Sequence, residues 1–224
     1  YRDQSSKMFL KELNITTPTT FVPDIVYSIN NRKLEKQEKT IGIALYCNYS
    51  KEKESLKKFV LDNLILLCQN LTDKGYKIRI IPMEVKNTKS DDRITANKII
   101  NKIKLVNNHA DICIEEPKNN EILSIVELFS NKDFILAYKT HSVVFSLINL
   151  VPCVAIAYHP KSIEFMESVN LKEYAIEDRN ATMEALNELI NKIIVNEKNI
   201  IITEKAGIEK NREIISNYIS TIVK

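Results

Sequence analysis

The sequence predicts an α/β fold: a Rossmann-like parallel sheet with helices on both faces. Between residues 40 and 180, short apolar runs alternate with segments of helical periodicity. A parallel sheet with helical crossovers requires this order. The apolar runs are nearly continuous rather than alternating, as in strands that are buried on both faces. Together the two patterns favour a buried parallel sheet at the centre of the chain.

The first strand and helix illustrate how each element is predicted. Residues 40–47 (TIGIALYC) form a short apolar run that is typical of a buried strand. Residues 51–73 repeat apolar side chains at helical spacing, and Asp73-Lys74-Gly75 supplies a helix stop with glycine just past the end. The same criteria predict further strands at 76–83, 110–115, 134–138, 153–158 and 174–176. They predict further helices at 91–106, 120–131, 142–150 and 161–169.

The two ends of the chain are expected to be helical. A short helix is predicted over 3–13, followed by a connector rich in proline and threonine. Two amphipathic helices, about 181–196 and about 203–222, are expected to pack on the sheet. The predicted organisation has three parts: an N-terminal helix and connector (1–39), a Rossmann-like α/β domain (40–180) and C-terminal helices on the same domain (181–224).

Composition excludes several classes of protein. The 224 residues carry a net charge of +3, too mild to indicate nucleic-acid binding, because 29 acidic residues offset 32 basic ones. No apolar run reaches the roughly 18 residues that a membrane span needs. The only glycines are Gly42, Gly75 and Gly207, which excludes a GxGxxG or Walker loop. Any phosphate must therefore be held in another way.

No metal site or cofactor is predicted. The four cysteines form no close pair, and the three histidines are not at ligand spacing. Cys68, Cys113 and Cys153 lie in apolar segments, which favours free buried thiols in a reducing compartment. His109 precedes a strand, at the wrong end of the sheet for a ligand, and is expected at the surface. The chain begins with Tyr1 rather than methionine, so we expect it to be the C-terminal portion of a longer protein.

Candidate ligand-binding residues follow the strands, because ligands of open parallel sheets bind outside the carboxyl ends of the strands. The candidates are Asn48, Tyr49, Ser50, Glu84, Glu116, Lys139, Thr140, His141, Ser142, His159, Pro160 and Lys161. Lys139 to Ser142 lie between a strand and the first turn of a helix. A helix start offers unpaired backbone N–H groups and a partial positive charge, to which Lys139 adds a full one. His141 adds a group that titrates near neutrality.

A second basic junction, Tyr158-His159-Pro160-Lys161, follows the next strand. Two neighbouring basic strand ends suit a small, multiply charged anion. The alternative is structural, since Ser142 can simply cap its helix and a lysine at a strand end can simply be solvated.

These residues resemble motifs of the polysaccharide pyruvyl transferase family. Three parts of the sequence resemble, in order, the family's Arg-x-His, Gly-x-Pro and Tyr-x-x-Lys elements. They are Phe134-Ile-Leu-Ala-Tyr-Lys139-Thr-His141-Ser, then Val151-Pro152 after an apolar helix, and finally a strand ending in Tyr158-His-Pro-Lys161. Arg2-Asp3 with Ser6, and Pro23-Asp24, resemble its Arg-Asp-x-x-Ser and Pro-Asp elements. The resemblance covers about residues 1–180.

The resemblance implies the C-terminal, donor-binding half of a two-domain enzyme with GT-B-type architecture. Such enzymes transfer pyruvyl from phosphoenolpyruvate to a saccharide or lipid-linked saccharide, usually as a ketal across two hydroxyls, in cell-surface polysaccharide biosynthesis. By this resemblance Lys139 and Arg2 hold the donor's phosphate and carboxylate, and His141 is the catalytic acid or base. Donor-binding roles are also expected for Thr140, Ser142, Tyr158, His159 and Lys161. We expect the enzyme to be cytoplasmic, and a peripheral position at the inner face of the membrane is compatible with this.

Two departures from the family pattern leave alternatives open. Lys139 stands where the family has arginine, so the planar two-pronged grip on an oxyanion is lost. Asn149-Leu150-Val151 stands where the family usually has glycine before Val-Pro. One alternative is a GT-B-type glycosyltransferase using a nucleotide sugar, which the scarcity of glycine disfavours. Another is a non-catalytic binding domain derived from the enzyme, which Lys139 favours.

Overall fold

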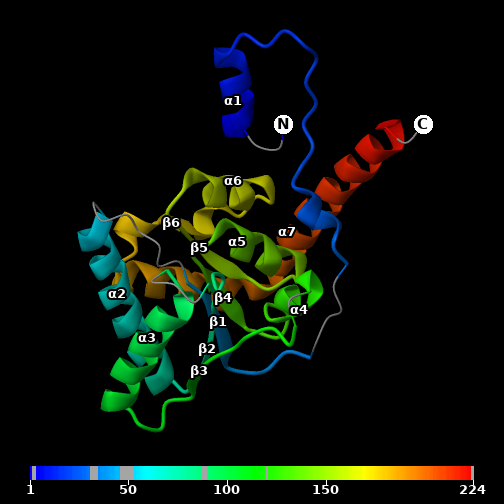
Figure 1. Cartoon of the computed structure of the whole chain (residues 1–224). Helices are drawn as coiled ribbons and strands as arrows, with labels where there is room; N and C mark the ends of the chain where they lie inside the picture. Colours follow the sequence, from blue (N-terminus) through cyan, green and yellow to red (C-terminus); the bar gives the residue numbers. More distant parts are fainter. Residues whose placement is uncertain (2–3, 31–34, 46–52, 87–89, 120, 223–224) are drawn as a thin grey trace.

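The computed structural model describes residues 1–224 except 2–3, 31–34, 46–52, 87–89, 120 and 223–224. Its centre is a six-stranded sheet in which every strand runs parallel to its neighbours (Figure 1). The strands are β1 (Thr40–Ala44), β2 (Lys77–Ile81), β3 (Ile112–Ile114), β4 (Phe134–Ala137), β5 (Cys153–Ala157) and β6 (Ala175–Glu177). The predicted α/β class and parallel sheet are confirmed.

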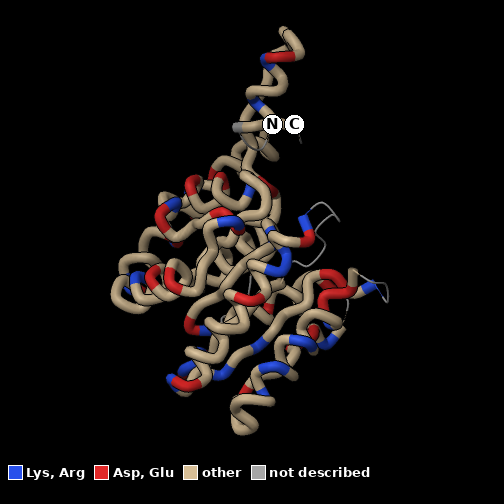
Figure 2. Tube along the Cα trace, turned by 90° about the vertical axis from the view of Figure 1, so that its left-hand side faces the viewer, with Lys and Arg blue, Asp and Glu red and all other residues tan. Residues whose placement is uncertain are grey.

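The helices connect the strands as the alternation predicts, and they cover both faces of the sheet. They are α1 (Gln4–Glu12), α2 (Glu54–Asp73), α3 (Asp92–Val106), α4 (Ile122–Glu127), α5 (Thr140–Ile148), α6 (Pro160–Ser168) and α7 (Met183–Ile222). Short 3-10 turns lie at Ile25–Ser28 (η1), Lys172–Tyr174 (η3) and Asp178–Asn180 (η4). Helix α2 packs on α3, α5 packs on α6, and α7 contacts both α2 and β5. Basic and acidic positions are interspersed along the chain rather than gathered into a basic face (Figure 2).

The strand order, β3-β2-β1-β4-β5-β6, reverses direction between β1 and β4. The chain builds outward from β1 to β3, then returns to the other side of β1 and builds outward again from β4 to β6. Open parallel sheets commonly bind ligands at such a point, outside the carboxyl ends of the strands. The candidate ligand site is therefore the edge where β4 ends, at Tyr138 and Lys139.

The central strands are completely buried, as their continuous apolar runs predict. Every residue of β1, β4 and β5 is buried. The fully buried side chain of Lys132 passes beside Gly42 of β1 and brings its ammonium group 2.9 Å from Glu115 Oε2. Burial lowers the pKa of Lys132, so this ion pair is what makes a charged lysine tolerable inside the sheet layer.

The prediction of two C-terminal helices is wrong. Residues 183–222 form one continuous 40-residue helix, α7, whose end projects away from the sheet (Figure 1). No glycine or proline stands between the two predicted segments, so nothing stops the helix there. Gly207, in the middle of α7, lets the helix approach Val169, because a Cβ at this position would lie 2.8 Å from the Val169 Cα.

Helix α4 is shorter than predicted, because Leu128, Phe129 and Ser130 donate backbone hydrogen bonds to carbonyls three residues back and form turns instead. Cys68 and Cys153 are buried free thiols as predicted, but Cys113 is exposed on the edge strand β3, where no further strand covers it. His109 is exposed, as predicted. Within the described part of the chain, no helix is both long and apolar enough to cross a membrane.

Leu150 stands before Val151-Pro152, where the resemblance leads us to expect glycine. Leu150 has a φ of 54°, in the left-handed region. Its N–H donates to Leu147 O, and the N–H of Val151 donates to Ser146 O. These two bonds form a Schellman motif at the end of α5, in which glycine is preferred because it carries no Cβ. The chain keeps the motif without the glycine, at the cost of local backbone strain.

Glu204 gives a testable pH dependence of stability. Its carboxyl lies on α7, is 0% exposed and has no hydrogen-bond partner among the described residues. Burial raises its pKa well above 4.5. A carboxyl with a raised folded-state pKa stabilises the fold fully below its unfolded pKa, and that contribution is lost as pH rises through the folded pKa. Glu204→Met has no carboxyl to ionise, so we expect it to keep its stability as pH rises. The difference between its melting temperature and that of the wild type should therefore grow in favour of the variant as pH increases from 4.5.

The measurement is thermal unfolding of both proteins across this pH range. Glu209→Met, which changes an exposed carboxyl on the same helix, is the matched control and should follow the wild type. A Glu204→Met curve parallel to the wild-type curve would contradict the expected role of the buried carboxyl.

Candidate functional site

The candidate site lies at the carboxyl edge of the sheet, where β4 meets the start of α5. Lys139 is the N-cap residue of α5 and has extended backbone angles, and its side chain does not cap the helix. The first turn of α5 therefore turns its N–H groups and its partial positive charge toward the edge. The predicted candidates Asn48, Tyr49 and Ser50, which follow β1, lie outside the described residues, as does Arg2.

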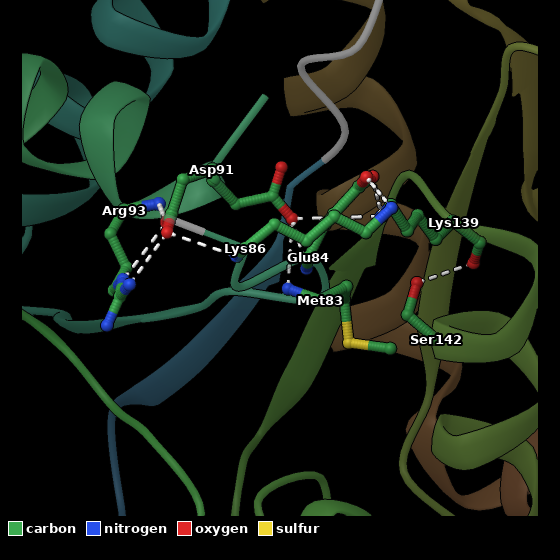
Figure 3. Close-up of polar contacts among 8 residues, drawn as sticks. Met83, Glu84, Lys86, Asp91, Arg93, Lys139 and Ser142 are labelled. Atoms are coloured by element: carbon green, nitrogen blue, oxygen red, sulfur yellow. Dashed lines mark hydrogen bonds and ion pairs between the residues drawn. The ribbon is translucent and has the colours of Figure 1, made fainter. Parts of the chain in front are cut away.

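The ammonium group of Lys139 lies between two carboxylates (Figure 3). Its Nζ is 3.0 Å from Glu84 Oε2 and 3.9 Å from Asp92 Oδ2. The side chains of Lys139 and Glu84 are 18% and 12% exposed, and that of Asp92 is 0% exposed. Glu84 also pairs with Lys86, Oε1 to Nζ, at 2.6 Å. The Lys139 ammonium group is thus held in place and largely neutralised by residues that follow β2.

Asp92 fixes the backbone that carries Glu84. Its Oδ2 accepts the N–H of Met83 at 3.0 Å and the N–H of Glu84 at 2.8 Å, while its own N–H donates to Glu84 O at 2.9 Å. The preceding residue, Asp91, caps α3 by accepting the N–H of Arg93 at 2.9 Å, and it also accepts the N–H of Lys86 at 3.2 Å. Two successive aspartates at the start of α3 therefore order the segment after β2 (Figure 3).

The two carboxylates titrate in opposite directions. Hydrogen bonds from Lys86 and from Lys139 lower the pKa of Glu84, so Glu84 is ionised at neutral pH. Burial raises the pKa of Asp92, although the Lys139 charge and the backbone N–H groups of Glu84 and Met83 oppose the shift. Glu84 is consequently the firm negative charge beside Lys139.

The remaining predicted residues of the β4 junction differ in what their side chains do. Ser142 is buried and donates its hydroxyl to Lys139 O at 2.6 Å, which favours the structural interpretation of this side chain. The hydroxyl of Thr140 lies 3.2 Å from that of Ser162 and joins the starts of α5 and α6. His141 is exposed on the first turn of α5, with its ring 6.2 Å from the Phe145 ring.

The β5 junction forms a second helix start beside the first. His159 is the N-cap of α6, and its Nδ1 accepts the N–H of Lys161 at 3.2 Å. Its Nε2 is then the protonated nitrogen in the neutral ring. Tyr158 is half-buried, and burial together with the Glu84 charge raises its pKa. The structure thus brings both predicted junctions to one edge of the sheet, whereas the donor-binding roles of their residues stay predictions.

Sequence reasoning missed Asp92 and did not connect Glu84 with Lys139. Glu84 was expected at the correct edge, as a residue that follows the second strand. Asp91-Asp92 carries only the signal of a helix start, which does not distinguish a surface cap from a buried clamp. Among the residues that the structure describes, no group of three or more histidine, cysteine, aspartate or glutamate side chains could hold a metal ion.

Comparison with known proteins adds a family and a fold. A family model described as polysaccharide pyruvyl transferase matches residues 1–160. No functionally curated protein matches the sequence.

Solved structures with the same fold are glycosyltransferases of GT-B type. An O-GlcNAc transferase from Thermobaculum terrenum has a TM-score of 0.51 at 11% identity, over 82% of this chain and 35% of its own. A UDP-forming α,α-trehalose-phosphate synthase from Burkholderia xenovorans has 0.52 at 13%, over 84% and 43%. Phytolacca americana UGT2 has 0.51 at 10%, over 96% and 52%. At such identities the likeness shows the fold alone, and the chain spans about a third to a half of the length of these proteins.

A double-mutant cycle tests the electrostatic link between Glu84 and Lys139. Lys139→Met removes one of the two ammonium groups that pair with the largely buried Glu84 carboxylate, and the charge beside buried Asp92, so we expect a loss of about 1–3 kcal/mol in the free energy of unfolding. Glu84→Gln should remove most of that penalty, giving a coupling energy of about 1 kcal/mol or more. The measurement is urea unfolding at neutral pH.

The exposed pair Glu54 and Lys57, 3.9 Å apart on α2, is the matched control. Its cycle should give a coupling of about 0.5 kcal/mol or less. Because the pKa of Glu84 is lowered, its stabilising contribution is present above pH 4.5 and is lost as pH falls through the folded-state pKa. A coupling equal to that of the control, or one that persists undiminished in acid, would contradict the assigned ion pair.

Proposed function

The chain belongs to the polysaccharide pyruvyl transferase family, and from that premise we propose that it is the donor-binding half of an enzyme that transfers pyruvyl from phosphoenolpyruvate to a saccharide. The observation that carries the proposal is the placement of Lys139-Thr140-His141. These residues stand where the family has its Arg-x-His element, and they lie at the start of α5, at the point where the strand order reverses.

The chemistry of this edge suits phosphoenolpyruvate. The donor carries a phosphate and a carboxylate, so its site must supply cations and oriented N–H groups. Lys139 supplies a cation, the start of α5 supplies backbone N–H groups and partial positive charge, and the start of α6, where His159 Nδ1 accepts the Lys161 N–H, adds partial positive charge. Tyr158, His159 and Lys161 extend the proposed donor edge toward β5. The substrate needs no glycine loop at such a site.

Glu84 sets a condition on donor binding. Its carboxylate neutralises Lys139 and repels an incoming anion. An ammonium group carries three N–H donors and can contact more than one oxyanion at once. We propose that Lys139 keeps its contact with Glu84 while it binds the donor, so that Glu84 orients the ammonium group. Lysine suits this shared position, since it acts as a compact point charge rather than as a fixed fork.

We assign the catalytic proton transfer to His141. Ketal formation requires a proton to add to the methylene carbon of phosphoenolpyruvate, which leaves a cation on the central carbon. A saccharide hydroxyl attacks that carbon and loses its proton. A second hydroxyl then displaces the phosphate, so two C–O bonds form, one breaks, and phosphate leaves with the remaining proton. An exposed imidazole at the start of α5 can reach a ligand bound there, and histidine is the side chain that most often serves as a general acid or base.

The rest of the assignment follows from the family and remains part of the proposal. The donor is a substrate and no cofactor is invoked. The acceptor is a saccharide or lipid-linked saccharide. The proposed setting is the biosynthesis of cell-surface polysaccharide, and the proposed location is the cytoplasm, including the inner face of the membrane. Because the chain spans about a third to a half of its structural neighbours, we propose that a second α/β half contributes acceptor contacts.

A second candidate function is glycosyl transfer from a nucleotide sugar. Its support is the fold, since the structural neighbours are glycosyltransferases. A non-catalytic binding domain is the third, and its support is Lys139 in place of arginine. Donor binding separates the three candidates.

We expect phosphoenolpyruvate to raise the melting temperature of the full-length enzyme and a UDP-sugar to leave it unchanged. Lys139→Met should abolish the shift, because the cation that contacts the donor is gone, and Lys139→Arg should retain it. The readout is thermal unfolding with each ligand in excess. A shift with the UDP-sugar alone would favour the second candidate, and no shift with either ligand would favour the third.

His141→Ala should lower the rate of phosphate release from phosphoenolpyruvate and a cognate glycan by about a hundredfold or more, the usual contribution of a general acid or base. The shift caused by phosphoenolpyruvate should remain. His109→Ala, at an exposed position before β3, is the matched control. Activity of His141→Ala within a few-fold of wild type would exclude this histidine as the catalytic group.

A further inference from the structure

A cavity of about 300 Å³ lies against α6 and shares Lys161 with the proposed donor edge. Ser162, Met166 and Val169 face the core. Another stripe of α6, Lys161, Glu164, Phe165 and Ser168, lines the cavity. These positions are spaced i, i+3, i+4, i+7, so they share one face of the helix. The connector before β1 and one residue of α7, Asn211, complete the walls.

The walls are largely aromatic. Phe21 and Pro23 come from the connector, and Phe165 comes from α6. Tyr27 of η1 lies beneath them, with its ring 6.1 Å from that of Phe165 and its hydroxyl 3.3 Å from that of Ser168. Apolar walls with a few polar groups are typical of small-ligand sites, and about 300 Å³ is at the lower end of their range. The cavity therefore fits one small ring rather than an extended ligand.

The charges exclude an anion. Three carboxylates line the cavity, those of Asp24, Glu164 and Glu167, against the single ammonium group of Lys161. Lys172 offsets only Glu167, at 3.1 Å. A phosphate or carboxylate would meet net negative charge here, so neither phosphoenolpyruvate nor a nucleotide suits the cavity.

Two polar groups of the lining lack partners. Asn211 is 4% exposed, and its Nδ2 has no hydrogen-bond partner among the described residues. Glu164 Oε1 accepts the hydroxyl of Ser5, whereas its Oε2 is buried and has no partner there. Unpaired buried donors and acceptors are costly and are rarely retained without a use. A ligand that both donates and accepts would satisfy the two groups together.

We propose that this cavity binds a neutral sugar ring of the acceptor. Hydroxyl groups donate to Glu164 and accept from Asn211, and the C–H face of a pyranose packs on the aromatic walls. The proposal rests on the proposed function, because it gives the acceptor a place beside the donor edge. Lys161 borders both: it belongs to the first turn of α6, and its side chain lines the cavity. The hydrogen-bonded pair Thr140 and Ser162 joins the two helix starts there.

The proposal also gives a use to Pro23-Asp24, the family element that the donor edge leaves aside. Asp24 Oδ1 accepts the N–H of Val26 at 3.1 Å and so caps η1. This cap holds Pro23 and Tyr27 against the cavity. The element thus builds one wall of the proposed sugar site.

The test uses the full-length enzyme and saturation-transfer NMR with the methyl glycosides of glucose, galactose, N-acetylglucosamine and N-acetylmannosamine at millimolar concentration. We expect at least one glycoside to receive saturation. Glu164→Gln keeps the size of the side chain and removes its charge, and it should weaken that binding about tenfold. Asn211→Leu removes the unpaired amide without creating a new buried polar group, and it should do the same. Glu173→Gln, outside the cavity, is the matched control and should leave binding unchanged.

Each outcome decides the proposal. Saturation that both variants weaken, while the phosphoenolpyruvate-induced thermal shift stays at the wild-type value, supports a sugar site separate from the donor edge. Saturation of no glycoside, saturation unchanged in both variants, or competition by UDP overturns it. Loss of the phosphoenolpyruvate response in the wild type, with glycoside binding intact, would remove the proposed pyruvyl transfer and leave the sugar site in place.

Discussion

The buried carboxylate of Asp92 joins three elements at the candidate site. It belongs to the first turn of α3, accepts two backbone N–H groups from the segment after β2, and lies 3.9 Å from the Lys139 ammonium group at the start of α5. Burying such a group is costly, and two backbone N–H donors and the Lys139 charge offset part of that cost, whereas the nearby Glu84 charge adds to it. Without this carboxylate, two partly buried N–H groups would lose their partner and Glu84 would lose its fixed position. The charge of Lys139 would then be held by a loose segment instead of a clamped one.

Because the chain has few glycines, other residues take most of its left-handed backbone positions. Left-handed turns are made by Asn14, Lys39, Leu150 and Asn170 rather than by glycine, with Gly75 as the exception. Both α5 and α6 end in Schellman hydrogen bonds around such a residue. The proposed anion site has no glycine loop and relies on helix starts and a lysine instead. Where a residue other than glycine takes a left-handed conformation, the chain accepts local backbone strain.

The sequence predicts the sheet and its binding edge because both depend on local patterns. Continuous apolar runs mark β1, β4 and β5, and the residue after each strand lies at the same edge in any parallel sheet. The contact between Glu84 and Lys139 depends on a non-local fact, since it requires β1 to lie between β2 and β4. The local pattern of apolar residues does not indicate the order of the strands in the sheet. The break predicted between 196 and 203 is absent from α7, and the local sequence already argues against it, because no glycine or proline stands there.

The paired charges at the edge imply a particular division of labour. At neutral pH Glu84 cancels the charge of Lys139, so the pair contributes orientation more than net attraction. A helix start supplies about half a unit charge, and two such starts do not balance a phosphate and a carboxylate together. The proposed donor would therefore need further positive charge from another segment, and the resemblance assigns that role to Arg2. On the two proposals together, selectivity follows from geometry: an anion would bind where cations from separate segments converge, and the cavity on α6, with three carboxylates against one ammonium group, would favour a neutral ring.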